Sequence, residues 1–240
     1  MASRSRVGAL ALIVFAIAGI AWFALELAPP NMGFEDTDSP AVSLRFLHAH
    51  DEIYAQGGIA LLLMSISLTV AVLAVWDALA PRVDALALRA TTAFGLFAAA
   101  FFFMHGVLRL GVEPLLYIDG MDHAWGEAAY VAIQMIGLHG FAQAAITAAC
   151  LWVTGLALIG LRTRVLPIAL CVLAIIPAFR LLAVLGPLGI LDVLPEETWF
   201  LFMAAIPGLL VWCLLLGIVL LRRAFASARA DRAVTAAAAA

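Results

Sequence analysis

Six long runs of hydrophobic residues, scarcely interrupted by charge, dominate this sequence. About 20 mostly apolar residues in a helix cross the roughly 30 Å hydrocarbon layer of a bilayer. A helix also satisfies its own backbone hydrogen bonds, which lipid cannot do. The pattern therefore predicts an all-α membrane bundle with six transmembrane helices. The runs are Val7–Ala28, Ile53–Ala78, Ala90–Gly111, Ala128–Leu161, Val165–Leu185 and Trp199–Leu221.

Composition excludes the main alternatives to this architecture. Hydrophobic residues make up 66% of the chain and charged residues 12%, whereas soluble domains carry about 25% charged residues. The apolar runs are also continuous, whereas the strands of a membrane barrel alternate apolar and polar residues in segments of about ten. We expect one membrane domain at residues 1–225 and a disordered cytoplasmic tail at residues 226–240, where alanine predominates without an apolar face.

The fourth run and the loop before the second run predict short helices outside the membrane core. A helix from Ala128 to Leu161 would be about 50 Å long, too long for one crossing, so we expect a break near Gly137-Leu138-His139-Gly140. The residues before that break would form an amphipathic helix on the outer surface. A second surface helix is expected to start at Asp38-Ser39-Pro40, because Asp or Ser caps a helix and Pro suits its first turn.

All thirteen basic residues are arginines, and their distribution orients the helices. In the six-helix arrangement ten lie on one side of the membrane and three, Arg45, Arg109 and Arg180, lie on the other. Cytoplasmic loops carry the excess of basic residues, so we expect both termini in the cytoplasm of a bacterial inner membrane. Thirteen of the sixteen acidic residues then fall on the outer side. Topology accounts for the arginines at the inner edge, and we expect no nucleic-acid partner.

The polar residues within the apolar runs lie mainly in their outer halves. Such residues are costly in a membrane and usually face a protein interior or a water-filled cavity. Glu26 is the nearest acid in depth to Arg109 or Arg180, and His105 shares a helix face with Arg109. Two interpretations remain open: an ion pair that holds helices together, or an arginine-lined site for a carboxylate, a phosphate or an anionic lipid head group. The predicted outward-facing pocket is lined by Glu26, Gln56, His105, Arg109, His139 and Arg180.

All five histidines fall in the outer half, which raises two cofactor hypotheses. His48, His50 and His123, among acidic residues, offer the nitrogen and oxygen ligands of a zinc or copper site. His105 and His139 stand on consecutive predicted helices and could be the axial ligands of haem b. Neither hypothesis has a sequence signature, because the HExxH and CxxCH motifs are absent. The main expectation is therefore no cofactor, with metal or haem as the alternative.

Recognisable catalytic motifs are missing from the chain. It contains no GxSxG nucleophile motif and no GxxxxGK[ST] or GxGxxG phosphate-binding motif. Enzyme activity is therefore less expected than binding. A small transporter or sensor subunit that uses the arginines is a further alternative, and membrane lipid is the expected partner in every case.

The order of these features resembles a known protein family. An arginine-led first helix is followed by a long acidic outer loop and by His48-Ala49-His50-Asp51-Glu52 at the start of the second helix. A polar outer segment then precedes Leu151-Trp152 and Val211-Trp212, each ahead of closing arginines. Together these features look like a family of bacterial integral membrane proteins known as a domain of unknown function. The resemblance spans nearly the whole chain and implies a fold but no activity.

We predict that both chain termini are accessible only from the cytoplasm, because the arginine-rich side of a bilayer protein stays inside. A phosphatase reporter that is active only outside the cytoplasm should be inactive when fused to either end. The same reporter inserted into the first outer loop, Pro29–Glu52, should be active. A reporter that is active at either terminus would reverse this orientation.

Overall fold

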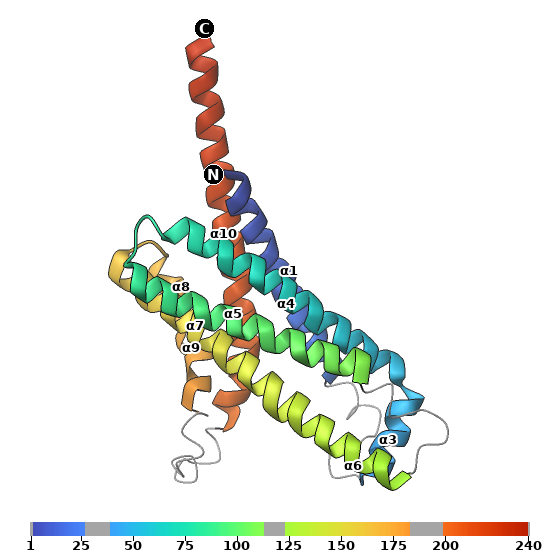
Figure 1. Ribbon diagram of the computed structural model, residues 1–240. Coiled ribbons are helices and arrows are strands. Elements are labelled where there is room, and N and C mark those ends of the chain that lie inside the picture. Colours follow the sequence, from blue (N-terminus) through green and yellow to red (C-terminus); the bar gives the residue numbers. More distant parts are fainter. Residues whose placement is uncertain (1, 27–38, 113–122, 183–198, 240) are drawn as a thin grey trace.

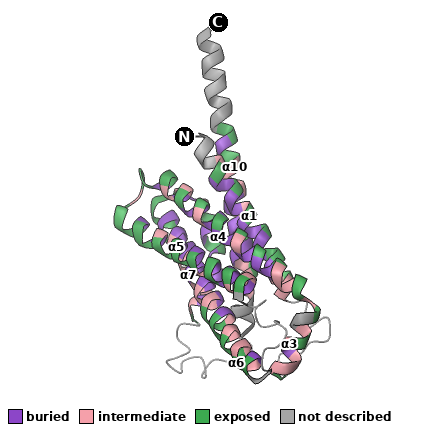
Figure 2. Ribbon diagram, turned by 45° about the vertical axis from the view of Figure 1, so that its right-hand side comes forward, coloured by how far each residue is buried: buried purple, intermediate pink, exposed green. Residues whose placement is uncertain are grey.

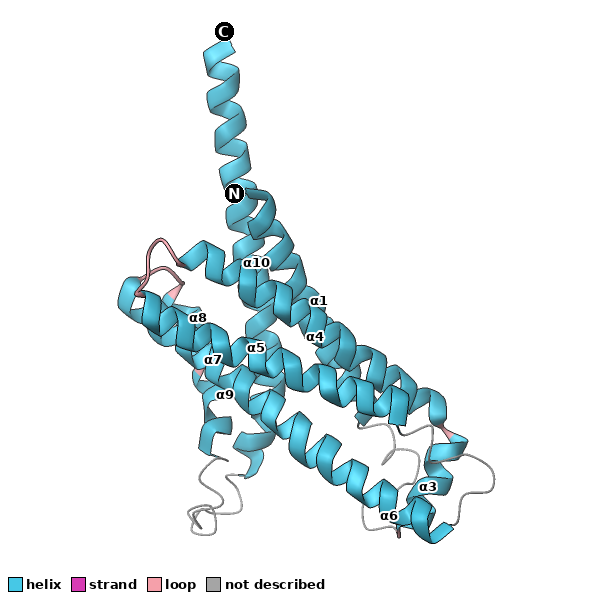
Figure 3. Ribbon diagram, in the orientation of Figure 1, coloured by secondary structure: helices cyan, strands magenta, loops and turns pink. Residues whose placement is uncertain are grey.

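Helices are the only regular structure in the part of the chain that the computed structural model describes, residues 2–26, 39–112, 123–182 and 199–239 (Figures 1 and 3). The predicted all-α fold is confirmed there. Two segments are π-helices, η1 (Leu108–Val112) and η3 (Met135–Ala142). The α-helices are α1 (Ala2–Glu26), α3 (Pro40–Ala49), α4 (Asp51–Leu79), α5 (Ala85–Val107), α6 (His123–Gln134), α7 (Gln143–Thr163), α8 (Ile168–Leu173), α9 (Ile175–Ala178) and α10 (Trp199–Ala239).

Five helical stretches among the described residues are long and apolar enough to cross a membrane, and they coincide with the first, second, third, fourth and sixth predicted runs. Large apolar side chains also cover the outside of the bundle. Ile17, Ile66 and Phe97 are each more than half exposed, and exposed segments alternate with buried ones along every long helix (Figure 2). Helices that are apolar on all faces suit a lipid environment. The five stretches are Arg6–Glu26, Asp51–Leu79, Ala85–Gly111, Trp125–Thr163 and Ala204–Ala226.

The fifth predicted crossing, Val165–Leu185, is not one long helix. A turn at Ala174 separates α8 from α9. Pro177 explains this turn, because proline has no amide hydrogen to donate to the carbonyl of Leu173, four residues earlier. The described part of the run is a shorter apolar segment, Ile168–Leu182, and its last three residues lie outside the description. Six crossings are therefore not confirmed.

The break expected near Gly137-Leu138-His139-Gly140 in the fourth run is wrong. Trp125–Thr163 is one helical stretch, and the chain widens to a π-helix at Met135–Ala142 without being interrupted. A π-helix still pairs backbone groups, five residues apart instead of four. An apolar helix can therefore change its local turn and still pair its backbone polar groups. A true break would leave some of these groups unpaired in lipid.

Two short helices, α3 and α6, lie at one end of the bundle and contact each other (Figure 1). Helix α3 begins at Pro40, as predicted from the sequence before it, and the carbonyl oxygen of Ser39 accepts hydrogen bonds from the amides of Val42 and Ser43. Proline suits this first position because its missing amide hydrogen would have had no helical partner. Helix α6 runs directly into η3, so it extends the fourth long helix.

The long helices contact one another in a closed order around the core. Helix α1 lies between α10 and α4, α5 lies between α4 and α7, and α8 and α9 join α7 to α10. The ring centroids of Phe15 and Phe102 lie 6.0 Å apart inside this arrangement, and those of Trp152 and Trp212 lie 6.3 Å apart. The indole nitrogen of Trp212 donates a hydrogen bond of 2.8 Å to the carbonyl of Leu170. The buried tryptophan therefore keeps its polar group paired.

Helix α10 continues to Ala239, where the sequence alone suggests disorder for residues 226–240. Its far end projects beyond the rest of the bundle (Figure 1). Alanine has the highest intrinsic helix propensity of all residues. This propensity accounts for a helix in a segment that has no apolar face.

Gly217 brings α10 against the backbone of α1, and we predict that even one added methyl group there destabilises the bundle. A Cβ atom at this position would lie 2.9 Å from the carbonyl oxygen of Ala9, which cannot move without its helix. Gly217→Ala should lower the free energy of unfolding by about 1–3 kcal/mol. Gly111→Ala is the control, because a Cβ there meets nothing within 4 Å. Thermal unfolding in detergent measures both variants. Equal melting temperatures of Gly217→Ala and Gly111→Ala would contradict the predicted contact.

Candidate functional site

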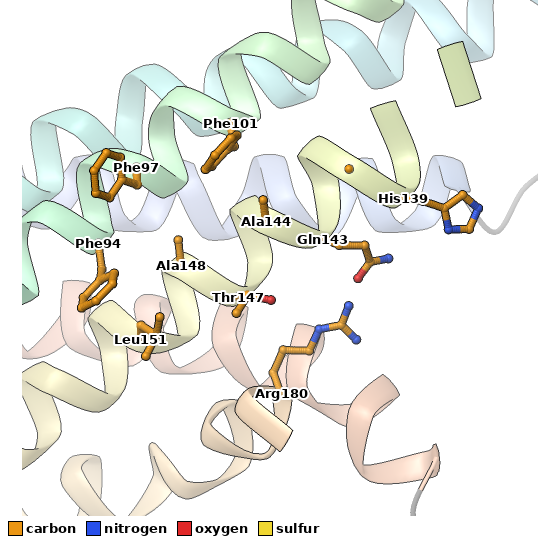
Figure 4. A pocket seen from close by; sticks show the side chains of 11 residues that line it. Phe94, Phe97, Phe101, His139, Gln143, Ala144, Thr147, Ala148, Leu151 and Arg180 are labelled. Carbon is orange, nitrogen blue, oxygen red and sulfur yellow. The ribbon is translucent and has the colours of Figure 1, made fainter. Parts of the chain in front are cut away.

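An open cavity of about 570 Å³ lies between α5 and α7. This volume is within the usual range of small-molecule sites, about 300–1,000 Å³. Helices α5 and α7 supply most of its lining, and the segment that follows α9 contributes one residue (Figure 4). No acidic side chain is among the lining residues. They are Phe94, Phe97, Phe101, His139, Gly140, Gln143, Ala144, Thr147, Ala148, Leu151 and Arg180.

One end of the cavity is polar. Arg180, in the short turn after α9, extends its guanidinium toward the side chain of Gln143 on α7 (Figure 4). Thr147 lies four residues after Gln143, so both occupy the same face of α7. His139 lies at the same end and is exposed. His139, Gln143 and Thr147 therefore line this end of the cavity together with the guanidinium.

Arg180 is deeply buried and incompletely hydrogen-bonded. Its residue is 7% exposed, and its Nε atom has no hydrogen-bond partner among the described residues. The side-chain oxygen of Gln143 is likewise buried without a partner there. A buried charge is costly unless it is paired, and a guanidinium offers a planar fork of donors that fits carboxylate and phosphate oxygens. The donors at the polar end can therefore receive negatively charged oxygen atoms.

The other end of the cavity is apolar. Phe94, Phe97 and Phe101 share one face of α5 because they are spaced by three and four residues. Opposite them, α7 presents the small side chains of Ala144 and Ala148 (Figure 4). Small residues on one wall and large rings on the other leave a hollow between two packed helices. Phe97 is 57% exposed, so this hollow reaches the apolar exterior of the bundle.

A second polar group lies where α1, α4 and η1 meet. Arg109 Nη1 is 2.6 Å from Glu26 Oε1, and these side chains are 4% and 22% exposed. The guanidinium carbon also lies 5.4 Å from the ring centroid of Tyr54, a favourable cation–π arrangement. Gly57 leaves the space for this guanidinium, because a Cβ there would be 2.6 Å from Arg109 Nη1. The ion pair therefore holds three elements together.

The six residues predicted to line one pocket fall into separate places in the structure. His139 and Arg180 line the cavity, whereas Glu26 and Arg109 form the buried ion pair. Of the two arginines that the sequence offers Glu26, the structure pairs it with Arg109. The ion-pair interpretation thus applies to Arg109, and the open-site interpretation stays a prediction for Arg180.

His105 and Gln56 belong to neither the cavity lining nor the ion pair. His105 is 2% exposed and packs against η3, where a Cβ on Gly137 would lie 3.5 Å from His105 Nε2. Its Nδ1 atom has no hydrogen-bond partner among the described residues. Gln56 is exposed on α4. A haem between His105 and His139 would need a space shared by both side chains, and the cavity that His139 lines does not include His105.

The predicted metal ligands lie on α3, at its end, and at the start of α6. His50 Nδ1 is 3.0 Å from the carbonyl oxygen of Phe46, and the two rings are stacked. The side chains of His48 and His123 lie outside the described residues, although α3 and α6 contact each other. Within the described part of the chain, no three His, Cys, Asp or Glu side chains gather as metal ligands. A metal site at His48, His50 and His123 stays a prediction.

The sequence does not reveal the aromatic wall of the cavity. Phe94, Phe97 and Phe101 look like ordinary lipid-facing residues until α5 is known to pair with α7. Thr147 offers a clearer signal, because it follows the polar Gln143 by one helical turn on an otherwise apolar helix.

Comparisons with family models, with curated proteins and with solved structures found no match to this chain. The resemblance to a bacterial membrane family therefore stays a prediction.

We predict that the Glu26–Arg109 pair is coupled in stability. Glu26→Gln should lower the free energy of unfolding by about 3–5 kcal/mol, because it leaves a nearly inaccessible guanidinium unpaired. Arg109→Met should cost less, since Glu26 is partly exposed. The double variant should be more stable than the sum of the two losses implies, by about 1 kcal/mol or more. Denaturant unfolding in detergent measures the free energies of this double-mutant cycle. Losses of stability that simply add would contradict a stabilising ion pair between Glu26 and Arg109.

Proposed function

We propose that this chain is a six-span protein of the bacterial cytoplasmic membrane, and that its cavity binds an anionic small molecule or lipid head group through Arg180. In this arrangement both termini lie in the cytoplasm, α3 and α6 lie on the outer surface, and the polar end of the cavity opens outward. The site is a binding site and requires no cofactor.

The packing of the helices supports the membrane arrangement. The shorter apolar segment Ile168–Leu182 contacts both α7 and α10, which supports the proposal that it is a sixth spanning element. An even number of crossings returns the chain to its starting side. At the end of the bundle where α1 begins, Arg6 lies over the ring of Phe225. Arg223 donates a hydrogen bond to the carbonyl of Val165. These arginines therefore serve as anchors at the end of the bundle that the basic residues assign to the cytoplasm.

The single observation that carries the binding proposal is the buried guanidinium of Arg180. It is 7% exposed, lines a cavity of about 570 Å³, and has no acidic side chain beside it among the lining residues. Arg109, by contrast, is matched by Glu26 and is not among the residues that line this cavity. An ionisable residue in the apolar part of a membrane protein is retained for a partner. For Arg180 that partner is a bound anion.

The surrounding side chains suit an oxyanion in particular. Arg180 supplies parallel N–H donors, and Gln143 and Thr147 add an amide and a hydroxyl that can donate to the same ligand. The apolar walls lower the local dielectric constant, which strengthens each charged hydrogen bond. Exposed His139 lies at the same end, where a ligand from the outer side would pass.

We predict that anions stabilise the wild-type protein and that Arg180→Gln abolishes this response. At ten times its dissociation constant, inorganic phosphate or citrate should add about 1.4 kcal/mol to the stability, which raises the melting temperature by about 3–5 °C. Sodium chloride at equal ionic strength controls for screening. Arg89→Gln is the matched variant, because Arg89 is exposed on α5 away from the cavity.

A purely structural Arg180 gives the opposite pattern. In that case Arg180→Gln lowers the melting temperature without any anion, and no anion raises the melting temperature of the wild type. That pair of results would refute the binding proposal. A binding role predicts that Arg180→Gln retains its basal stability, because no lining carboxylate loses its partner.

A further inference from the structure

We propose that the occupant of the cavity is an anionic glycerophospholipid, with its phosphate at Arg180 and one acyl chain in the aromatic half between α5 and α7. This inference rests on the proposed function and specifies its ligand. The protein would thereby distinguish anionic from zwitterionic lipid at its outer surface.

The lining of the cavity changes from polar to apolar along one direction. Gln143 and Arg180 stand at one end, and Phe94 and Leu151 stand at the other (Figure 4). From Gln143 to Leu151 helix α7 rises by about 12 Å, at about 1.5 Å per residue. A head group at one end and a hydrocarbon chain along the rest match this gradient.

The size of the cavity argues against a bare inorganic anion as the natural occupant. Its volume of about 570 Å³ would hold nearly twenty water molecules at about 30 Å³ each. A phosphate ion at Arg180 would leave most of that space, including the faces of three phenylalanines, without an apolar partner. Water against those rings is unfavourable. A ligand that carries a hydrocarbon chain fills both halves.

The open side of the hollow gives a lipid direct access. Phe97 and Phe94 are 57% and 37% exposed on the apolar exterior of α5. In a six-span bundle this exterior is in contact with bilayer chains. A lipid can therefore place one chain between α5 and α7 while the other stays in the surrounding bilayer.

The charges at the polar end favour an anionic head group. Arg180 neutralises the phosphate, and the lining residues include no carboxylate to pair with a choline or ethanolamine cation. A zwitterionic head group would bring a positive charge next to a guanidinium. A phosphatidylglycerol head group brings neutral hydroxyls, which Gln143 and Thr147 can hydrogen-bond.

The two halves of the cavity should contribute differently to binding. An acyl chain that leaves the bilayer for the groove gains little hydrophobic energy, because both surroundings are apolar. Arg180 should therefore determine the affinity and the head-group preference. The groove should determine whether a chain-bearing ligand fits at all.

The experiment compares phosphatidylglycerol, phosphatidylcholine and chain-free glycerol phosphate on the full chain in a zwitterionic detergent. Bound lipid is counted by native mass spectrometry, and the melting temperature is recorded with each probe. Arg180→Gln tests the head-group contact. Ala144→Leu fills the groove at a half-buried position, and Ala148→Leu fills it independently in case the first variant does not fold. Ala100→Leu, an exposed position of α5 outside the lining, is the matched control.

We expect the wild type to retain phosphatidylglycerol at least about tenfold more tightly than phosphatidylcholine, and Arg180→Gln to lose this preference. The groove-filling variants should weaken phosphatidylglycerol at least about tenfold and leave the response to glycerol phosphate within about twofold. Ala100→Leu should behave as the wild type. A tenfold change in affinity corresponds to about 1.4 kcal/mol.

Two outcomes separate failure of the lipid inference from failure of the proposed function. If Ala144→Leu and Ala148→Leu bind phosphatidylglycerol as the wild type does, no acyl chain occupies the groove and the lipid inference is overturned, while anion binding at Arg180 stands. If neither phosphatidylglycerol nor glycerol phosphate binds the wild type, the proposed function falls and the lipid inference falls with it.

Discussion

The cost of burying a guanidinium inside an apolar bundle governs the polar half of this protein. Arg109 and Arg180 are each less than a tenth exposed. Arg109 is compensated within the chain, by Glu26 on one side and the ring of Tyr54 on the other. Arg180 faces a cavity whose lining has no acid. The first arginine therefore has its partner within the described chain, whereas the second has no acidic neighbour among the residues that line its cavity.

The fold was largely predictable because lipid allows so few solutions. Long apolar runs must be helices if their backbone groups are to be paired, and five of the six runs are long apolar helices in the described structure. The failures concern local geometry that hydropathy does not encode. Pro177 divides the fifth run into α8 and α9, and the expected break in the fourth run is a π-helix. Both segments are as apolar as their neighbours, so hydropathy does not distinguish them, and Pro177 is the sequence signal for the turn in the fifth run.

The sequence predicted one contact of the polar residues as an alternative, but it did not predict which residues share the cavity. It offered Arg109 or Arg180 as the partner of Glu26, and the structure pairs Glu26 with Arg109. Which residues share a cavity depends on which helices are neighbours, and a single sequence does not give that order. Once α5 lies beside α7, Phe97 and Ala144 become opposite walls of one hollow. The neighbours of His105 and Arg109 could not be predicted for the same reason. His105 packs against η3, whereas Arg109 contacts Glu26 on α1.

Irregular backbone and ionisable side chains coincide in the half of the bundle that the sequence predicts to face outward. Arg109 lies in the π-helix η1, His139 lies in the π-helix η3, and Arg180 lies in a short turn of 3₁₀ geometry after α9. A π-turn adds about one residue to the helical repeat, which rotates the side chains that follow by about 100°. Arg109 contacts Glu26 on α1, whereas His105, one turn earlier, packs against η3. π-Turns inside α-helices are frequently found at functional sites. In this chain one such turn holds the arginine of the ion pair, and the other holds His139, which lines the same end of the cavity as Arg180.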